Sequence, residues 1–177
     1  MALDLSKYIS SIPDYPKKGI IFRDIMPLLA NADALQQACD SIVDFAKDKG
    51  ITKVVAPEAR GFILASAIAC RIGAGFVPAR KPNKLPGDVV SASYDLEYGS
   101  ATLEMQKNAI KKGDKVLVMD DLLATGGTIG ATIDLVDKLG GEVKSAAFMI
   151  ELKGLPGRKV LADHRVNDIL TLMSFDS

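Results

Sequence analysis

One stretch of the chain, residues 115–128 with the sequence KVLVMDDLLATGGT, restricts the fold more than any other. Its apolar run Val116–Met119 is closed by charged residues, which is typical of a strand covered on both faces in a parallel sheet. Two carboxylates, Asp120 and Asp121, follow at the carboxyl end of this strand. Because ligands bind at that end in open α/β sheets, the sequence predicts that the two carboxylates take part in binding or chemistry.

The residues after the carboxylates predict a glycine loop at a helix N-terminus. Beyond Thr128, apolar residues recur with helical period and stop at Gly140 and Gly141. Glycines allow backbone N–H groups to turn inward, and the helix dipole adds partial positive charge at the same place. Such a loop favours an anion, for example a phosphate group.

Several phosphate-binding motifs compete for this loop. A Walker loop is excluded because no lysine lies near the glycines. A dinucleotide fingerprint would need glycine at Thr125, Gly127 and Gly130, and it has two of the three, with Glu151 as the ribose-binding acid. However, two acidic residues separate the strand from the glycines, and they would face the pyrophosphate. A sugar phosphate fits better, because carboxylates accept hydrogen bonds from vicinal hydroxyls while the loop binds the phosphate.

Residues 118–128, VMDDLLATGGT, resemble the phosphoribosyl-pyrophosphate motif of the phosphoribosyltransferases, and the LLA form resembles the adenine enzymes of that family. The resemblance extends over roughly residues 12 to 158, and the tail after about Val160 is assigned no chemistry. It implies that Asp120 and Asp121 hold the ribose hydroxyls. It also implies that the 5′-phosphate is bound by Ala124, Thr125, Gly126, Gly127 and Thr128.

Two other segments resemble the same family. Residues 57–61, PEARG, connect a short strand over residues 52–56 to a helix over residues 62–72 that is apolar on all sides and therefore expected to be buried. The family's pyrophosphate loop has this sequence, which assigns Glu58, Ala59 and Arg60 to pyrophosphate. Near the N-terminus, the sequence FRDI resembles the family's purine pocket and assigns Phe22 and Arg23 to adenine.

The region from residue 80 to residue 100 is expected to cover the site. Residues 80–88 contain three cations with two prolines and a glycine, which indicates a mobile, positively charged loop in which Arg80, Lys81 and Lys84 grip the pyrophosphate. The following segment alternates like a strand and resembles the family's hood. Within it, the resemblance implies that Glu97 contacts the purine as an acid and that Tyr98 binds adenine.

Composition restricts the partners. The 177 residues are 48% hydrophobic, without a bilayer-length apolar run or a basic-then-apolar leader, so one soluble domain over residues 1–177 is expected, with no membrane partner. Lys+Arg 22 against Asp+Glu 22 gives zero net charge, which disfavours a nucleic-acid partner. Cys39 and Cys70 are expected to be buried free thiols in a reducing cytoplasm. The single histidine, His164, leaves little material for a catalytic triad.

The predicted fold is a doubly wound α/β domain with a mostly parallel sheet of about five strands, flanking helices, and a small hood from about residues 1–30 and 80–100. The resemblance implies transfer of the phosphoribosyl group of phosphoribosyl pyrophosphate to adenine, giving AMP and pyrophosphate. It further implies Mg²⁺ near the acidic pair, a homodimer, and Glu97, Asp120, Asp121 and Arg60 as the catalytic residues. Two alternatives stay open: transfer to another base, and a regulator that binds purine or phosphoribosyl pyrophosphate without turnover.

Overall fold

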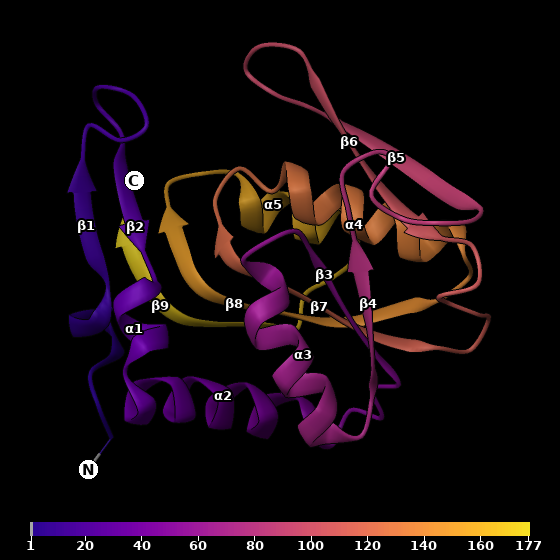
Figure 1. Cartoon of the computed structure of the whole chain (residues 1–177), viewed down its shortest axis with the longest axis horizontal. Helices are drawn as coiled ribbons and strands as arrows, with labels where there is room; N and C mark the ends of the chain where they lie inside the picture. The colour runs from indigo at the N-terminus through magenta and orange to yellow at the C-terminus, as the bar shows by residue number, and fades with distance from the viewer. Residues whose placement is uncertain (1) are drawn as a thin grey trace.

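Five parallel strands form the central sheet of the computed structural model, which describes residues 2–177 (Figure 1). Their order is β4-β3-β7-β8-β9, and every neighbouring pair is parallel. The strands are β3 (Lys53–Pro57), β4 (Gly75–Ala79), β7 (Lys115–Leu123), β8 (Glu142–Lys153) and β9 (Ile169–Asp176). The predicted doubly wound α/β fold is confirmed.

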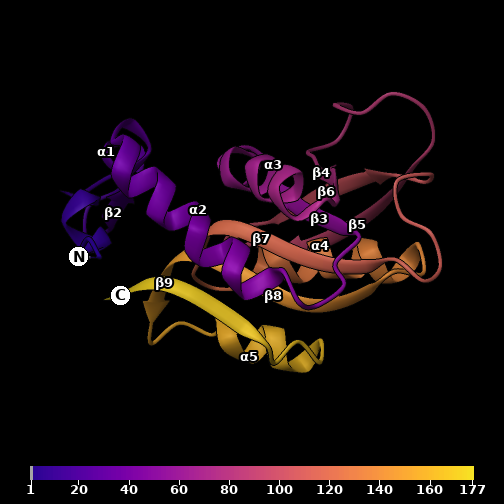
Figure 2. The ribbon, with the colours of Figure 1, turned by 90° about the horizontal axis from the view of Figure 1, so that it is seen from below.

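Helices cover both faces of this sheet (Figure 2). One face packs against α2 (Ala32–Ala46) and α3 (Gly61–Ile72), and the other against α4 (Gly127–Lys138) and α5 (Gly157–Asp163). Successive strand residues alternate between the two cores: Leu117 faces the α2 and α3 side, whereas Val116 and Val118 face the α4 side. Burial of both faces explains the continuous apolar runs in the sequence.

Two small antiparallel pairs lie outside the central sheet (Figure 1). The N-terminal hood consists of a 3-10 helix, η1 (Leu5–Tyr8), the strands β1 (Ser10–Pro13) and β2 (Ile21–Asp24), and the short helix α1 (Met26–Ala30). The second pair is a hairpin of β5 (Val89–Asp95) and β6 (Ser100–Gln106), which lies against α4. Among residues 2–177, the helices are too short or too polar to cross a membrane.

Local signals and the structure agree at the start of α2 and differ in three other places. The side chain of Asn31 caps α2 by accepting a hydrogen bond of 3.0 Å from the backbone N–H of Ala34. Strand β7 continues to Leu123, so the acidic pair lies within the strand and not after it. The prediction of two buried thiols is wrong for Cys70, which is exposed, whereas Cys39 is buried. The prediction that the helix over residues 62–72 is buried on all sides is also wrong, because Ile63, Ser66, Cys70 and Arg71 are exposed on the outer side of α3.

Candidate active site

The site lies where the chain changes direction across the sheet. From β3 the chain passes through α3 to β4 on one side, and from β7 it passes through α4 to β8 on the other. Because β3 and β7 are neighbours, their diverging connections leave a crevice at the carboxyl ends of the two strands. A pocket of about 180 Å³ occupies this place. It is lined by Arg60, Asp120, Asp121, Leu122, Leu123, Ala124, Thr125, Gly126, Gly127, Thr128 and Ile129.

The acidic pair is held in the floor of this pocket. Asp121 is buried, and its carboxylate pairs with the Nε of Arg60 from the neighbouring loop at 2.8 Å. An Oδ1 of Asp120 accepts the backbone N–H of Asp121 at 2.8 Å. Desolvation raises the pKa of Asp120 well above its ordinary value, and the adjacent charge of Asp121 raises it further. The pair therefore favours a ligand that brings hydroxyl groups or a cation.

The glycine loop forms the wall of the pocket beside the acidic pair. Gly126 is the N-cap of α4 with φ of +89°, a backbone conformation that residues other than glycine rarely adopt. Helix α5 supports the loop from outside the pocket: the N–H of Gly157 donates to the carbonyl of Ala124 at 3.0 Å, and Val160 packs against Gly126. The C-terminal segment, which the sequence left without a role, thus fixes the shape of the loop.

Gly126→Ala is expected to lower the free energy of unfolding by about 1–3 kcal/mol and to weaken the binding of a phosphate group at the loop. A Cβ at this position would lie 2.8 Å from the Cβ of Val160 and 3.1 Å from the Cα of Gly157. The strain therefore has a steric and a backbone component. Combining the change with Val160→Ala should recover only a small part of the loss, because alanine keeps the Cβ and removes only the contact with Cγ2 at 3.0 Å. Chemical denaturation of both variants and of Val160→Ala alone measures this, and wild-type stability in Gly126→Ala would contradict it.

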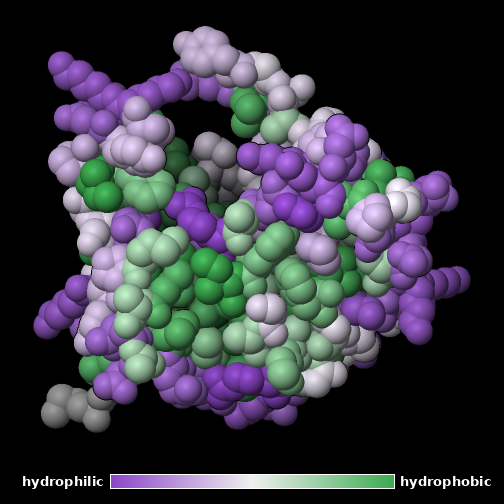
Figure 3. Space-filling model, viewed as in Figure 1, coloured by the Kyte–Doolittle hydropathy of each residue, from purple (hydrophilic) through white to green (hydrophobic). Residues whose placement is uncertain are grey.

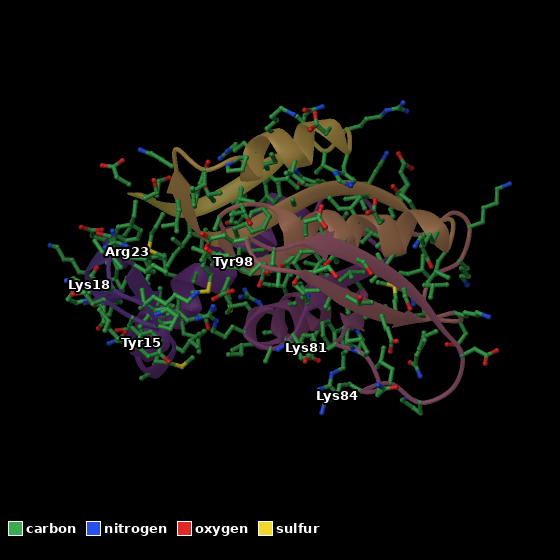
Figure 4. All side chains as sticks on the ribbon, turned by 90° about the horizontal axis from the view of Figure 1, so that it is seen from above. Tyr15, Lys18, Arg23, Lys81, Lys84 and Tyr98 are labelled. Atoms are coloured by element: carbon green, nitrogen blue, oxygen red, sulfur yellow. The ribbon has the colours of Figure 1, made fainter. Side chains whose placement is uncertain are left out.

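Phe22 and Arg23 lie on opposite sides of β2. The ring centroid of Phe22 is 5.1 Å from the guanidinium carbon of Arg60, so Phe22 borders the pocket. Arg23 instead stacks over Phe175 at 4.5 Å from its ring centroid, and it is labelled on the hood in Figure 4. Neighbouring residues of a strand alternate between its two faces, which accounts for the different surroundings of these two side chains. The structure brings Phe22 to the site and turns the side chain of Arg23 away.

Of the cationic residues assigned to the pyrophosphate, only Arg60 lines the pocket. Arg60 lines the pocket, and the peptide bond between Glu58 and Ala59 just before it is cis. Arg80 at the end of β4 forms an ion pair of 2.7 Å with Glu58. Lys81 and Lys84 are exposed on the loop at the edge of the molecule (Figure 4).

The tip of the β5–β6 hairpin extends above the pocket-bearing face. Glu97 and Tyr98 are both exposed there, and 81% of Tyr98 is accessible to solvent. The Nζ of Lys17 in the N-terminal hood lies 5.9 Å from the ring centroid of Tyr98. Side chains form a bridge above a hollow on this face (Figure 3). The two parts of the hood therefore approach each other over an open space.

Glu151, the acidic residue that a dinucleotide site would need, is already bound by other side chains. Glu151 on β8 accepts two hydrogen bonds from Arg158, at 2.8 and 2.7 Å, and another from Thr171 at 3.2 Å. The hydrogen bonds from Arg158 lower the pKa of Glu151. Its carboxylate anchors α5 to the sheet and is not free to bind a ribose.

Sequence comparison and structural comparison lead to the same family. The phosphoribosyl transferase domain family matches residues 26–167. The adenine phosphoribosyltransferase of Thermoanaerobacter pseudethanolicus is 45% identical, with a TM-score of 0.92 and coverage of 97% of this chain and 98% of that one. The enzyme of Giardia lamblia, solved with 9-deazaadenine, is 37% identical, with a TM-score of 0.92 and coverage of 98% and 97%.

A third solved structure carries two ligands. The adenine phosphoribosyltransferase of Saccharomyces cerevisiae, complexed with an imino-altritol bisphosphate and adenine, is 36% identical, with a TM-score of 0.88 and coverage of 96% of each chain. The three relatives match this chain over nearly its whole length. The chain therefore belongs to the phosphoribosyltransferase family, in the group of the adenine phosphoribosyltransferases.

Proposed function

We propose that the chain transfers the phosphoribosyl group of phosphoribosyl pyrophosphate to adenine, giving AMP and pyrophosphate. The observation that carries this proposal is that a carboxylate pair and a glycine loop at a helix N-terminus share one pocket. The related structure from Trypanosoma brucei, 26% identical, is in complex with AMP, pyrophosphate and ribose-5-phosphate. AMP and pyrophosphate are the two products of the reaction that we propose here.

In the proposed reaction, N9 of adenine forms a bond to the anomeric carbon as the bond from that carbon to the pyrophosphate oxygen breaks. The leaving pyrophosphate takes the electron pair, and the ring proton of adenine passes to the carboxylate of Glu97. Ala124–Thr128 hold the 5′-phosphate, while Asp120 and Asp121 bind the ribose hydroxyls and stabilise the positive charge that grows on the ring. Arg60, with Arg80, Lys81 and Lys84 once the loop closes, neutralises the leaving group.

Adenine is placed between the hood and the pocket. Phe22 offers an aromatic ring at the pocket edge, and Leu122, which the sequence did not single out, lines the pocket next to the acidic pair. Since the side chain of Arg23 points away, we expect Arg23 to contribute through its backbone groups. Tyr98 and Glu97 would reach the base when the hairpin tip moves down onto it.

The two carboxylates of the pocket fit a magnesium ion that is bound mainly by the phosphates of the substrate. Mg²⁺ is usually bound by one or two carboxylates together with phosphates and water. Asp120 and Asp121 supply such a pair, and residues 2–177 contain no group of three or more His, Cys, Asp or Glu side chains that would form a protein cage. When bound with phosphoribosyl pyrophosphate, the ion neutralises charge on the leaving pyrophosphate.

A single assay tests the proposed function. Incubation of the protein with labelled adenine, phosphoribosyl pyrophosphate and Mg²⁺ should give labelled AMP, and hypoxanthine or guanine in place of adenine should react much more slowly. Preferential reaction of another base would identify a transferase of different specificity. Binding of both substrates without product would identify a regulator and overturn the enzymatic proposal.

We further propose that the chain forms a homodimer through the outer side of α3. Ile63 on this helix is 42% exposed, Met26 on α1 is 47% exposed, and apolar side chains gather over these helices in Figure 3. Contiguous exposed apolar surface of this kind marks an interface.

The free thiols Cys39 and Cys70 support a reducing, cytoplasmic location.

Ile63→Glu is expected to convert dimers into monomers, because a charge in the centre of an apolar interface is not solvated. Sedimentation velocity measures the change. Asn108→Glu adds the same charge at an exposed turn and serves as the matched control. A wild-type protein that sediments as a monomer at micromolar concentration would overturn the proposed dimer.

A further inference from the structure

Tyr94 connects the hood hairpin to the glycine loop. This half-buried residue is the penultimate residue of β5. Its hydroxyl accepts a hydrogen bond of 3.2 Å from the Oγ1 of Thr128, in the first turn of α4. Its ring lies on Gly127, where a Cβ would come within 2.8 Å of the ring. Only glycine at position 127 allows this close contact.

Tyr94 is also where the hairpin leaves the body of the molecule. At the other end of α4, the Nζ of Lys138 donates a hydrogen bond to the carbonyl of Ser91, so β5 is attached along the helix. Beyond Tyr94 the hairpin is exposed through its turn at residues 96–99 (Figure 1). Tyr94 thus fixes the base of the projecting tip that carries Glu97.

The Tyr94–Thr128 contact bears on phosphate binding because a threonine hydroxyl has only one hydrogen to donate. Thr128 lines the pocket, and its hydroxyl donates to Tyr94. A phosphate oxygen can only accept, so Thr128 must turn its hydrogen toward the phosphate when the ligand binds. Its oxygen then needs a donor. A tyrosine hydroxyl can accept in the first state and donate in the second.

We propose that Tyr94 is a positioning residue for the 5′-phosphate: its hydroxyl donates to Thr128 in the bound state and thereby orients the Thr128 hydroxyl toward the ligand. This inference rests on the proposed function, which assigns the loop to the 5′-phosphate. Tyr94 itself does not touch the reacting atoms. Its contribution is to keep Thr128 in the rotamer that binds phosphate and to place the hairpin base at the same time.

Tyr94→Phe tests the role, since it keeps the ring on Gly127 and removes only the hydroxyl. Calorimetric titration with AMP and with ribose 5-phosphate should show dissociation constants raised about 2- to 10-fold, the value of one neutral hydrogen bond. The KM for adenine should not change. Ser93→Ala, which removes a hydroxyl hydrogen-bonded to Thr102 at 2.8 Å on the same hairpin, should bind both ligands like wild type.

A double-mutant cycle separates orientation from packing. In a Thr128→Val background, Tyr94→Phe should cause no further loss, because the hydroxyl that Tyr94 orients is already absent. Wild-type affinity in Tyr94→Phe, or the same loss in the Thr128→Val background, would overturn the inference. If the unmutated protein bound neither AMP nor ribose 5-phosphate, the proposed function itself would fail, which is a different result.

Discussion

Replacing Asp120 and Asp121 together with asparagine is expected to lower kcat by on the order of 10²- to 10³-fold while the protein still folds. Both carboxylates lie in the floor of the pocket next to the phosphate-binding loop. Asparagine is nearly isosteric, but it lacks the charge that holds a pair of ribose hydroxyls or a hydrated metal ion. It also leaves Arg60 without its partner, since the ion pair of 2.8 Å to Asp121 is lost.

Steady-state kinetics and circular dichroism measure the two halves of this prediction. The control is Asp44→Asn, which changes an exposed carboxylate on α2 that pairs with Lys47. It should leave kcat unchanged. Turnover like that of the wild type in the double variant would show that the acidic pair does not act in the reaction.

Asp120 is expected to lower the free energy of unfolding at neutral pH. Because desolvation raises the pKa of Asp120, the folded state retains a proton that the unfolded state has already released, and stability therefore falls as pH rises above the unfolded pKa. Asparagine cannot ionise and removes this loss. Asp120→Asn alone should thus melt at the wild-type temperature or above it at neutral pH. Such an exchange of stability for function is expected of a site residue.

The sequence predicted the parts of the site that depend on local pattern. Apolar runs and glycines follow from backbone geometry, so the sheet and the loop at Gly126 lie where they were expected, whereas the acidic pair lies within β7 and not after it. The neighbouring positions of β3 and β7 then bring Arg60 to Asp121, although 61 residues separate them in the sequence.

Side-chain direction and long-range packing were harder to foresee. Arg23 follows Phe22 directly, and strand alternation sends it to the other side of β2, where it stacks on Phe175 from the opposite end of the chain. Val160 on α5 packs under Gly126, and Tyr94 on the hairpin packs over Gly127. None of these contacts has a sequence period, because each joins elements that only the tertiary fold brings together.

Glu97→Gln and Glu97→Leu are expected to slow the chemical step, by on the order of 10²-fold for the leucine variant and by less for the glutamine variant. When N9 of adenine attacks the sugar, the imidazole ring must lose its proton, and a carboxylate near N7 can accept it; in the reverse reaction the same group acts as the acid. Glutamine can still donate a hydrogen bond, but it cannot transfer a proton, and leucine can do neither. The purine preference should stay with adenine, because we expect the groups near Phe22 to bind the opposite edge of the base.

Single-turnover kinetics isolate this step from product release. In the structure Glu97 is exposed at the hairpin tip, so a role in proton transfer requires the hairpin to close and exclude water before the bond forms. Asp95→Asn changes another exposed acid on the same hairpin and should leave the rate unchanged. An unchanged rate in Glu97→Leu would instead limit Glu97 to covering the site. Glu97→Leu should lower this rate without changing the affinity for AMP. Such a result would separate proton transfer by Glu97 from phosphate positioning by Tyr94.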